Sequence, residues 1–175
     1  MTVAVLFTMK DSVYETIPGV DCWPLQRNAL NYRGPYRVIA HPPCSRWGNY
    51  ATKGDRLVGD DDNCFAHALW SVRTFGGIIE HPANSKAWDW FGIAKPTRPG
   101  WARADMWGYT CCVEQGNYGH VARKATWLYA SSIKLHELTW KSSENKHSPV
   151  MDISQQEREA TPVAFAEALV AMASQ

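Results

Sequence analysis

The sequence predicts an α/β domain with a three-layer, Rossmann-like arrangement and a mostly parallel sheet. Short apolar runs of strand length alternate along the chain with segments of helical pattern. Two of these runs, 36–40 and 77–82, each lead into a polar residue and a proline, and the helical segment 60–77 joins them. A strand, a helix and a second strand in this order predict a βαβ unit with parallel strands. The 175 residues, 45% of them hydrophobic, suit a single domain over 1–175.

The first part of the chain predicts two strands and two helices. The run TVAVLF (2–7) has the length and composition of a buried strand, and VDCW (20–23) is a second candidate. Between them, we expect Asp11 to cap a short helix that ends before Pro18. The segment 24–32 begins with a proline, which the first turn of a helix tolerates, and predicts another helix.

The remaining elements follow from equally local patterns. The segment 60–77 has an acidic start, apolar residues at helical spacing and two glycines at its end, which predicts a helix with one buried face. The run ATWLYAS (125–131) predicts a further strand. The segment 161–174 predicts a C-terminal helix, with Thr161 as its cap and a proline at its first position.

Composition narrows the classes of function. The formal net charge of +1 gives no broad cationic field for tight, sequence-independent clamping of a nucleic-acid backbone, so a small ligand or a short nucleic-acid contact is the expected partner. No apolar run has the length of a membrane span, and the start of the chain lacks the features of a signal peptide. We therefore expect a cytoplasmic protein with no membrane partner, whose five cysteines are reduced thiols; no oligomeric state is implied. The nine tryptophans indicate packing of a loop-rich flank, with base stacking as the alternative.

The stretch AHPPCSRWG (40–48) carries the strongest functional hypothesis. Its two prolines end a strand and fix Cys44 at the carboxyl edge of the predicted sheet. Glu80 and His81 end the neighbouring strand, and the carboxyl ends of parallel strands meet at one crevice, so we expect Cys44 and Glu80 to share a pocket. Arg46 is expected to lower the pKa of the thiol. The alternative is that Cys44 is a buried core cysteine.

A thiol and a carboxyl at one pocket suit chemistry on an electron-poor ring. A thiolate can add to C6 of a pyrimidine, while a protonated carboxyl hydrogen-bonds the ring at N3 and stabilises the charge that develops. This pairing makes Cys44 and Glu80 the candidate catalytic residues of an enzyme that acts on a pyrimidine base.

Four segments, taken in chain order, resemble the catalytic domain of DNA cytosine-5 methyltransferases. HPPCSRW is similar to the nucleophile loop of that family, with Cys44 as the attacking thiol, and IIEHP is similar to its Glu-Asn-Val segment, with Glu80 as the carboxyl that engages the base. VEQGNYGHVARKATWLYAS resembles the family's Gln-x-Arg-x-Arg segment and the strand after it, and EATPVAFAEALVAMA resembles its last helix. The chain as a whole also resembles small bacteriophage proteins.

The resemblance implies a function, a cofactor and site residues. The function is C5 methylation of cytosine, or related C5/C6 chemistry, on a nucleotide or nucleic acid, with S-adenosylmethionine as cofactor. The implied substrate-binding residues are Arg46, His81, Tyr118, Arg123 and Lys124. The implied cofactor-binding residues are Phe7, Asp21 (or Gln26 in its place), Pro42 and Thr161.

The chain also departs from the family pattern. The stretch LFTMKDSVYET lacks the glycines that let the family's backbone approach the cofactor. Ala122 stands at the position of the glutamine, and Lys124 and Thr126 stand where the two arginines belong. Only a short polar stretch lies where the family inserts its target-recognition domain, so no separate recognition domain is expected. Without one, a free nucleotide or a single strand is a more suitable substrate than duplex DNA.

Two other classes of function compete with this one. The first is a non-catalytic nucleotide- or protein-binding module of phage origin, of a counter-defence type, on a degenerate methyltransferase-like fold. The second is a metalloenzyme, because histidine nitrogens and a thiolate at strand ends are suitable zinc ligands. The candidate ligands are His41, Cys44, His81 and His120.

Overall fold

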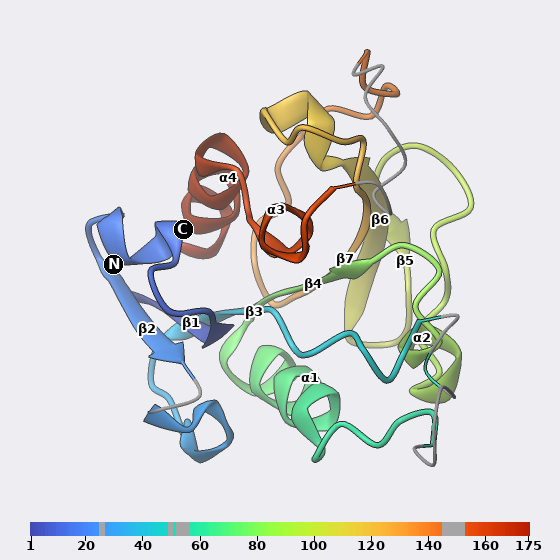
Figure 1. Ribbon diagram of the computed structural model, residues 1–175. Coiled ribbons are helices and arrows are strands. Elements are labelled where there is room, and N and C mark those ends of the chain that lie inside the picture. The colour runs from blue at the N-terminus through green and yellow to red at the C-terminus, as the bar shows by residue number, and fades with distance from the viewer. Residues whose placement is uncertain (25–26, 49–50, 52–56, 145–152) are drawn as a thin grey trace.

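A single seven-stranded sheet forms the centre of the molecule in the computed structural model (Figure 1). The structure describes all residues except 25–26, 49–50, 52–56 and 145–152. The strands lie in the order β2-β1-β3-β4-β7-β6-β5. Their bounds are β1 Val3–Thr8, β2 Val20–Pro24, β3 Arg37–Ala40, β4 Gly77–Pro82, β5 Ala102–Arg103, β6 Gly108–Glu114 and β7 Ala125–Ser131. The α-helices are α1 Cys64–Phe75, α2 Ala87–Trp90, α3 Gln155–Glu159 and α4 Val163–Ala173, and the 3-10 helices are η1 Val13–Thr16, η3 Ala29–Asn31 and η4 Gln115–Tyr118.

The β3–α1–β4 segment is the βαβ unit that the sequence predicts. Its strands pair in parallel, with Ile39 opposite Ile78. The pairing is close at its start, because a Cβ on Gly77 would lie 1.9 Å from the carbonyl oxygen of Val38. Only glycine fits this position, whose φ of +145° is also one that side chains rarely adopt. At the other end of α1, the Asp61 carboxylate accepts the Phe65 N–H at 2.9 Å and caps the helix.

The sheet is mixed, and the expectation of a mostly parallel, Rossmann-like sheet is not confirmed. Among the described residues, the pairs β1–β2, β1–β3 and β3–β4 are parallel, whereas β4–β7, β6–β7 and β5–β6 are antiparallel. The link between β6 and β7 contains only the one-turn η4, which is too short for a parallel crossover. The sequence patterns predicted β7 but not its direction, and they missed β5 and β6.

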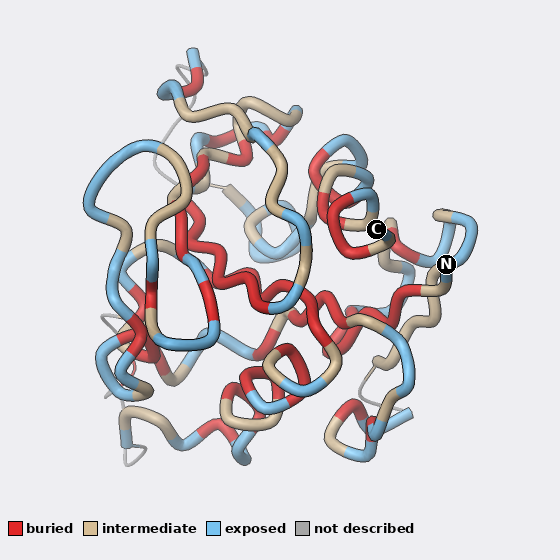
Figure 2. Tube along the Cα trace, turned by 180° about the vertical axis from the view of Figure 1, so that it is seen from behind, coloured by how far each residue is buried: buried red, intermediate tan, exposed pale blue. Residues whose placement is uncertain are grey.

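The two faces of the sheet carry separate hydrophobic clusters. Figure 1 shows α1 below the sheet and α4 above it. The α1 face buries Phe65, Trp88 and Trp127, and the α4 face buries Tyr14 and Phe165. Figure 2 shows that the buried stretches run through the middle of the fold, where the strands lie. Within the described chain, no helix is both long and apolar enough to cross a bilayer.

Several local predictions are corrected in detail. Ser12 rather than Asp11 caps η1, because the Ser12 hydroxyl accepts the Tyr14 N–H. The helix expected over 24–32 is not formed as such: β2 extends to Pro24 and only the short η3 follows among the described residues. At the C-terminal helix the cap is Pro162 and not Thr161.

Candidate functional site

Cys44 lies just beyond the carboxyl end of β3, in a turn that Pro42 and Pro43 begin. The Trp47 N–H donates to the Cys44 carbonyl at 3.0 Å and closes this turn. The Cys44 residue is exposed, whereas the Trp47 ring is buried beneath it. Cys44 is therefore not part of either hydrophobic core, although its sulfur is partly covered by the neighbouring chain.

A pocket of about 180 Å³ opens beside the thiol. Its walls come from the Cys44 turn and from the end of β4 with the residues that follow it. The lining residues are Cys44, Trp47, Gly48, His81, Pro82, Ala83 and Ser85. The pocket is therefore a largely apolar slot with a thiol at its rim and an imidazole in its wall.

His81 is the polar group of this slot. Its ring is buried against Phe65, at 5.3 Å between ring centroids, and stacks on Trp88 at 6.2 Å. Neither ring nitrogen has a hydrogen bond of good geometry to a described residue. Burial lowers the pKa of His81 to about 4, against the opposing effects of Glu80 and of the Pro42 and Pro43 carbonyls, so the ring is neutral at pH 7. A neutral, buried imidazole without strong partners is available to a bound ligand.

Glu80 precedes His81 on β4 and lies in a hydrogen-bonded chain. One carboxylate oxygen bonds to His41 Nδ1 at 3.0 Å, and the other accepts the Gln115 amide N–H at 2.9 Å. His41 Nε2 in turn lies 3.0 Å from the Tyr14 hydroxyl, and the Gln115 amide nitrogen also donates to Thr126 at 3.0 Å. Gln115 Oε1 is buried without a partner among the described residues.

This chain of contacts keeps the carboxyl ionised. Burial would raise the pKa of Glu80, but the hydrogen bond and charge of His41, with smaller contributions from Lys124 and His81, hold the pKa below its usual value. A protonated Glu80 that donates to a ring nitrogen is therefore not its resting state. That role requires a proton from a neighbour or from the substrate.

The pKa of the Cys44 thiol is also shifted, upward and not downward as the sequence predicts. Burial of the sulfur and the nearby charge of Glu80 raise the pKa of Cys44, and Glu159 adds to the effect while Lys124 opposes it. Arg46 does not lower the pKa of the thiol as the sequence predicts, because its guanidinium donates a hydrogen bond to the Ala51 carbonyl at 3.2 Å. Cys44 is thus a thiol at neutral pH.

Glu80 and His81 lie on opposite faces of the sheet, because successive side chains of a strand alternate. His81 contacts the aromatic residues of the α1 face, and Glu80 joins Tyr14 of the α4 face through His41. Glu80 is not among the residues that line the slot beside Cys44. The thiol is at the border of both faces, close enough to Glu80 for the two charges to interact.

Lys124 is the cation at this border. Its ammonium donates to the Ala160 carbonyl at 2.8 Å, directly after α3, and His120 Nε2 lies 2.9 Å from the Glu157 carbonyl of the same helix. The pKa of Lys124 is lowered, because the effect of burial outweighs the opposing effects of the negative charges of Glu80, Cys44 and Glu159. These contacts hold α3 over the strand ends.

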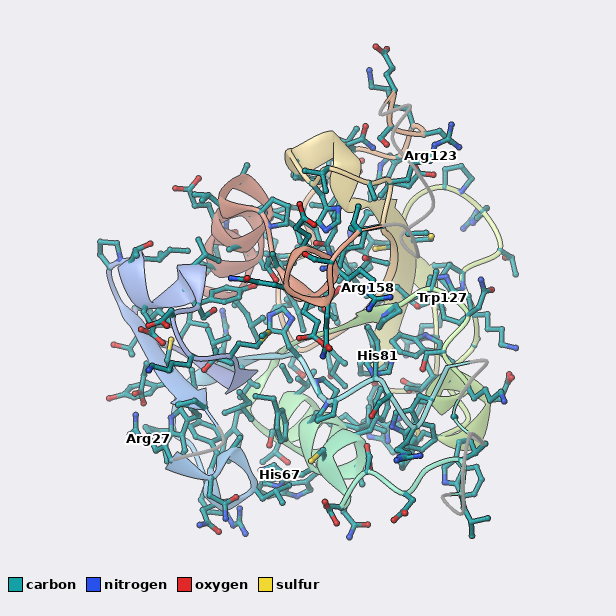
Figure 3. All side chains as sticks on the ribbon, in the orientation of Figure 1. Arg27, His67, His81, Arg123, Trp127 and Arg158 are labelled. Carbon is teal, nitrogen blue, oxygen red and sulfur yellow. The ribbon has the colours of Figure 1, made fainter. Side chains whose placement is uncertain are left out.

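Other expected substrate-binding residues lie elsewhere. The Tyr118 ring packs on Phe165 at 5.0 Å, and its hydroxyl accepts the Thr139 N–H at 3.0 Å, so it supports the α4 face. Arg123 is exposed and carries its side chain on the upper right of the molecule in Figure 3. Of the five expected residues, His81 and Lys124 are the two that the structure brings to Cys44.

The residues implied for S-adenosylmethionine do not fit that cofactor. Asp21, the expected ribose partner, already pairs with Arg27 and accepts the Trp23 indole N–H at 3.0 Å. Beyond β1, where the family has glycines, Tyr14 is fully buried and bonded to His41. Tyr14 is thus part of the packed α4 face and not of an open pocket.

The other implied cofactor residues add no pocket for it. Phe7 and Pro42 are buried and Thr161 is half-buried, and none of the three lines the slot beside Cys44 or the pocket along β6. Gln26 lies outside the described residues.

The proposed metal ligands do not converge either. Within the described residues, no three histidine, cysteine, aspartate or glutamate side chains are placed to hold one ion. His41 and His81 are on opposite faces of the sheet, and His120 bonds to the Ala122 and Glu157 carbonyls.

Comparison with known proteins identified no family model, no curated protein and no solved structure that matches this chain. The site described above therefore stands on its own geometry. Sequence reasoning missed Tyr14 and Gln115 as partners of the His41–Glu80 pair. No local pattern marks either residue, because each reaches the site from a distant element.

Proposed function

We propose that this protein binds a pyrimidine base, as part of a nucleotide or nucleic acid, in the slot beside Cys44 and acts on it by reversible addition of the thiolate to C6. The observation that carries the proposal is the slot itself: an exposed thiol at its rim, and a buried imidazole in its wall whose two nitrogens have no strong partner among the described residues. A flat heterocycle with polar edges supplies what both groups lack.

The addition balances without a further reagent. The Cys44 thiol loses its proton to solvent, the S–C6 bond forms, and the electron pair of the C5–C6 double bond moves toward C5 and the polar edge of the ring. A proton from solvent adds at C5. Loss of a C5 proton and departure of the thiolate regenerate the base, so the net result is exchange of the C5 hydrogen with solvent. No step passes through S-adenosylmethionine, because the residues implied for it do not fit.

Three residues near Cys44 have supporting roles. His81 hydrogen-bonds an edge of the ring, since its neutral imidazole can donate from one nitrogen and accept at the other. Lys124 lowers the pKa of Cys44 and so favours the attacking thiolate. Glu80 acts from the opposite face, where it opposes thiolate formation and holds His41 in place.

The fold adds limited support. The strands β1, β3 and β4 are parallel, and Cys44 and Glu80 lie at the carboxyl ends of β3 and β4. The resemblance to cytosine-5 methyltransferases implies the same arrangement. We propose that the domain is a reduced, methyltransferase-like α/β unit whose antiparallel half closes the site.

The test is C5 hydrogen exchange in D₂O. Pyrimidine nucleotides and short oligonucleotides are incubated with the protein, and uptake of one deuterium per base is read by mass spectrometry. We expect exchange with the unaltered protein and none with Cys44→Ser, while Cys22→Ser, a thiol change on β2, retains it. A 5-fluoropyrimidine substrate, whose C6 is more electron-poor, should populate a reversible adduct on Cys44 that mass spectrometry under native conditions detects. Absence of both exchange and adduct for every pyrimidine substrate would overturn the proposal.

A second candidate is the non-catalytic binding module. It is favoured by the raised pKa of Cys44 and by the engagement of both Glu80 oxygens, since neither group is activated at rest. Its expected result is pyrimidine binding that survives Cys44→Ala without any exchange, measured by calorimetry beside the deuterium assay.

A further inference from the structure

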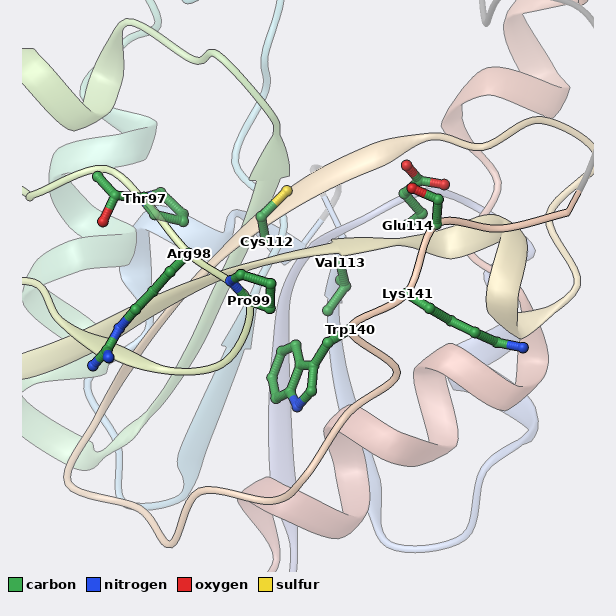
Figure 4. A pocket seen from close by; sticks show the side chains of 10 residues that line it. Thr97, Arg98, Pro99, Cys112, Val113, Glu114, Trp140 and Lys141 are labelled. Carbon is green, nitrogen blue, oxygen red and sulfur yellow. The ribbon is translucent and has the colours of Figure 1, made fainter.

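A second pocket, of about 290 Å³, lies along the edge of β6 (Figure 4). β5 pairs with Tyr109 and Thr110 only, and within the described chain no strand covers that edge of β6 beyond them. The pocket begins there, with Cys112, Val113 and Glu114 as one wall. The other walls are the loop 96–99 and the segment 140–142.

The pocket combines an aromatic face with two cations. Figure 4 shows the Trp140 ring near the centre and the side chains of Arg98 and Lys141 extending toward opposite ends. Trp140 is half-buried and held in place, because its indole N–H donates to Glu137 at 2.7 Å and its ring packs edge-on against Trp101.

The charges of the pocket favour an anion. Arg98 and Lys141 are exposed, and neither forms a salt bridge with a described residue. The acidic group in the lining is Glu114, and its carboxylate already accepts the Ser143 N–H at 2.7 Å. An aromatic platform flanked by cations is the arrangement that binds single-stranded nucleic acids, by stacking of a base and neutralisation of phosphates.

The position of the pocket connects it to the Cys44 slot. His81 in the wall of the slot pairs across the sheet with Trp127, which pairs in turn with Cys112 in the wall of the second pocket. Figure 3 shows the labelled His81 and Trp127 one after the other along this row. Two strand spacings separate the His81 and Cys112 backbones by about 10 Å. Trp140, however, packs on the α4 face and the slot opens on the α1 face, so the path between the two pockets runs around the edge of β6. A strand that occupies both pockets therefore spans more than the roughly three stacked nucleotides that correspond to about 10 Å.

We propose that the Trp140 pocket is a subsite for a nucleotide of the same single strand whose target pyrimidine enters the Cys44 slot. Trp140 stacks on the base, and Arg98 and Lys141 bind phosphates on either side of it. The inference rests on the proposed function of the Cys44 slot and names its substrate class, a single-stranded oligonucleotide. A duplex is disfavoured, because paired bases cannot enter two pockets at this spacing without being unpaired.

The test compares substrates of increasing length. Binding and C5 deuterium exchange are measured with a pyrimidine mononucleotide, a tetranucleotide and a hexanucleotide. We expect the unaltered protein to bind the tetranucleotide at least about tenfold more tightly than the mononucleotide, from one stacked base. Trp140→Ala removes this gain, and Trp140→Phe, which retains an aromatic face, recovers part of it. Exchange on the mononucleotide is unchanged in both variants.

The cations are tested without risk to the fold, because both are exposed. The slope of log Kd against log salt for the hexanucleotide falls by about 0.7 for each phosphate that is no longer neutralised, in Arg98→Gln and in Lys141→Gln. Lys134→Gln, a change of an exposed lysine outside the pocket, leaves the slope as it is. Affinity that is independent of length, or slopes that do not respond to either substitution, would overturn the subsite while exchange on the mononucleotide upholds the Cys44 proposal. Trp140-dependent oligonucleotide binding with no exchange at any length would overturn the Cys44 chemistry alone.

Discussion

Glu80 and His81 are neighbours on β4, yet they lie in environments that differ in almost every physical respect. Glu80, on the α4 face, bonds to His41 and Gln115, which bond in turn to Tyr14 and Thr126. His81, on the α1 face, lies among aromatic rings and has no strong hydrogen bond to a described residue. The chain, in which both Glu80 oxygens are bonded, stabilises the fold, whereas the imidazole without strong partners beside a pocket is available to a ligand.

Replacing Glu80 is expected to have the largest effect on stability. Glu80→Leu leaves the His41 ring and the Gln115 amide without their buried partner, and should lower the free energy of unfolding by about 4 kcal/mol. Urea unfolding followed by circular dichroism measures this loss. The matched change on the other face, His81→Phe, should cost less than about 1 kcal/mol at pH 8, because no good hydrogen bond is removed. Equal losses in the two variants would contradict the contrast between the faces.

The pH dependence of His81 sharpens the same contrast. Its pKa is 6.5 in an unfolded chain and about 4 in the fold, so between these values the unfolded state binds more protons. Stability is therefore lost as the pH falls from 6.5 toward 4, by up to about 3 kcal/mol. His81→Phe should remove this part of the acid sensitivity. Free energies of unfolding of both proteins at pH 7 and pH 4.5 test the prediction, which fails if the two proteins lose stability in parallel.

Tyr14 tests how far the polar chain extends. Tyr14→Phe removes the hydroxyl that bonds to His41 and retains the buried ring, so a loss of about 1 kcal/mol is expected. Tyr118→Phe, which removes the hydroxyl that accepts the Thr139 N–H, is a control outside the chain. In the double variant Tyr14→Phe, Glu80→Leu the losses should be less than additive, because the residues belong to one network. Strict additivity would show that the Tyr14 hydroxyl acts independently of Glu80.

The smallest expected effect is on the reactivity of Cys44. Alkylation of its thiol by iodoacetamide should have a pH midpoint above that of an ordinary cysteine, because burial and Glu80 raise its pKa. Lys124→Gln removes a nearby positive charge and should move the midpoint up, whereas Glu80→Gln removes a negative charge and should move it down. Peptide mass spectrometry locates the label on Cys44. A midpoint that does not respond to either change would separate the thiol from both charges.

Local patterns in the sequence accounted for part of this site. The Pro-Pro pair before Cys44 and the helix between two apolar runs placed Cys44 and Glu80 at neighbouring strand ends, and the pairing of β3 with β4 confirms this. The partners of Glu80 could not be found in the same way. Tyr14 and Gln115 reach it from η1 and η4, and such contacts depend on how distant elements pack rather than on local periodicity.

The error in sheet direction has a similar origin. The apolar run 125–131 is typical of a strand, and β7 confirms it, but a run of residues has the same pattern in either direction. The preceding strand, β6, alternates only partly between buried and exposed residues and was not predicted. The short link between β6 and β7 permits only an antiparallel pair, and the antiparallel pairing of β7 with β4 sets the direction of both strands in the sheet.

The amino-acid sequence by itself determined the elements whose cause is local: the βαβ unit, the glycines that end its helix, and the proline turn that carries Cys44. Tertiary structure alone decided which residues surround that thiol, that the pKa of Cys44 is raised rather than lowered, and that a second pocket lies at the edge of β6. The physical reason is that hydrogen bonding, burial and charge act over a few ångströms in space. Residues that are far apart in the chain come within that distance only when the whole sheet has formed.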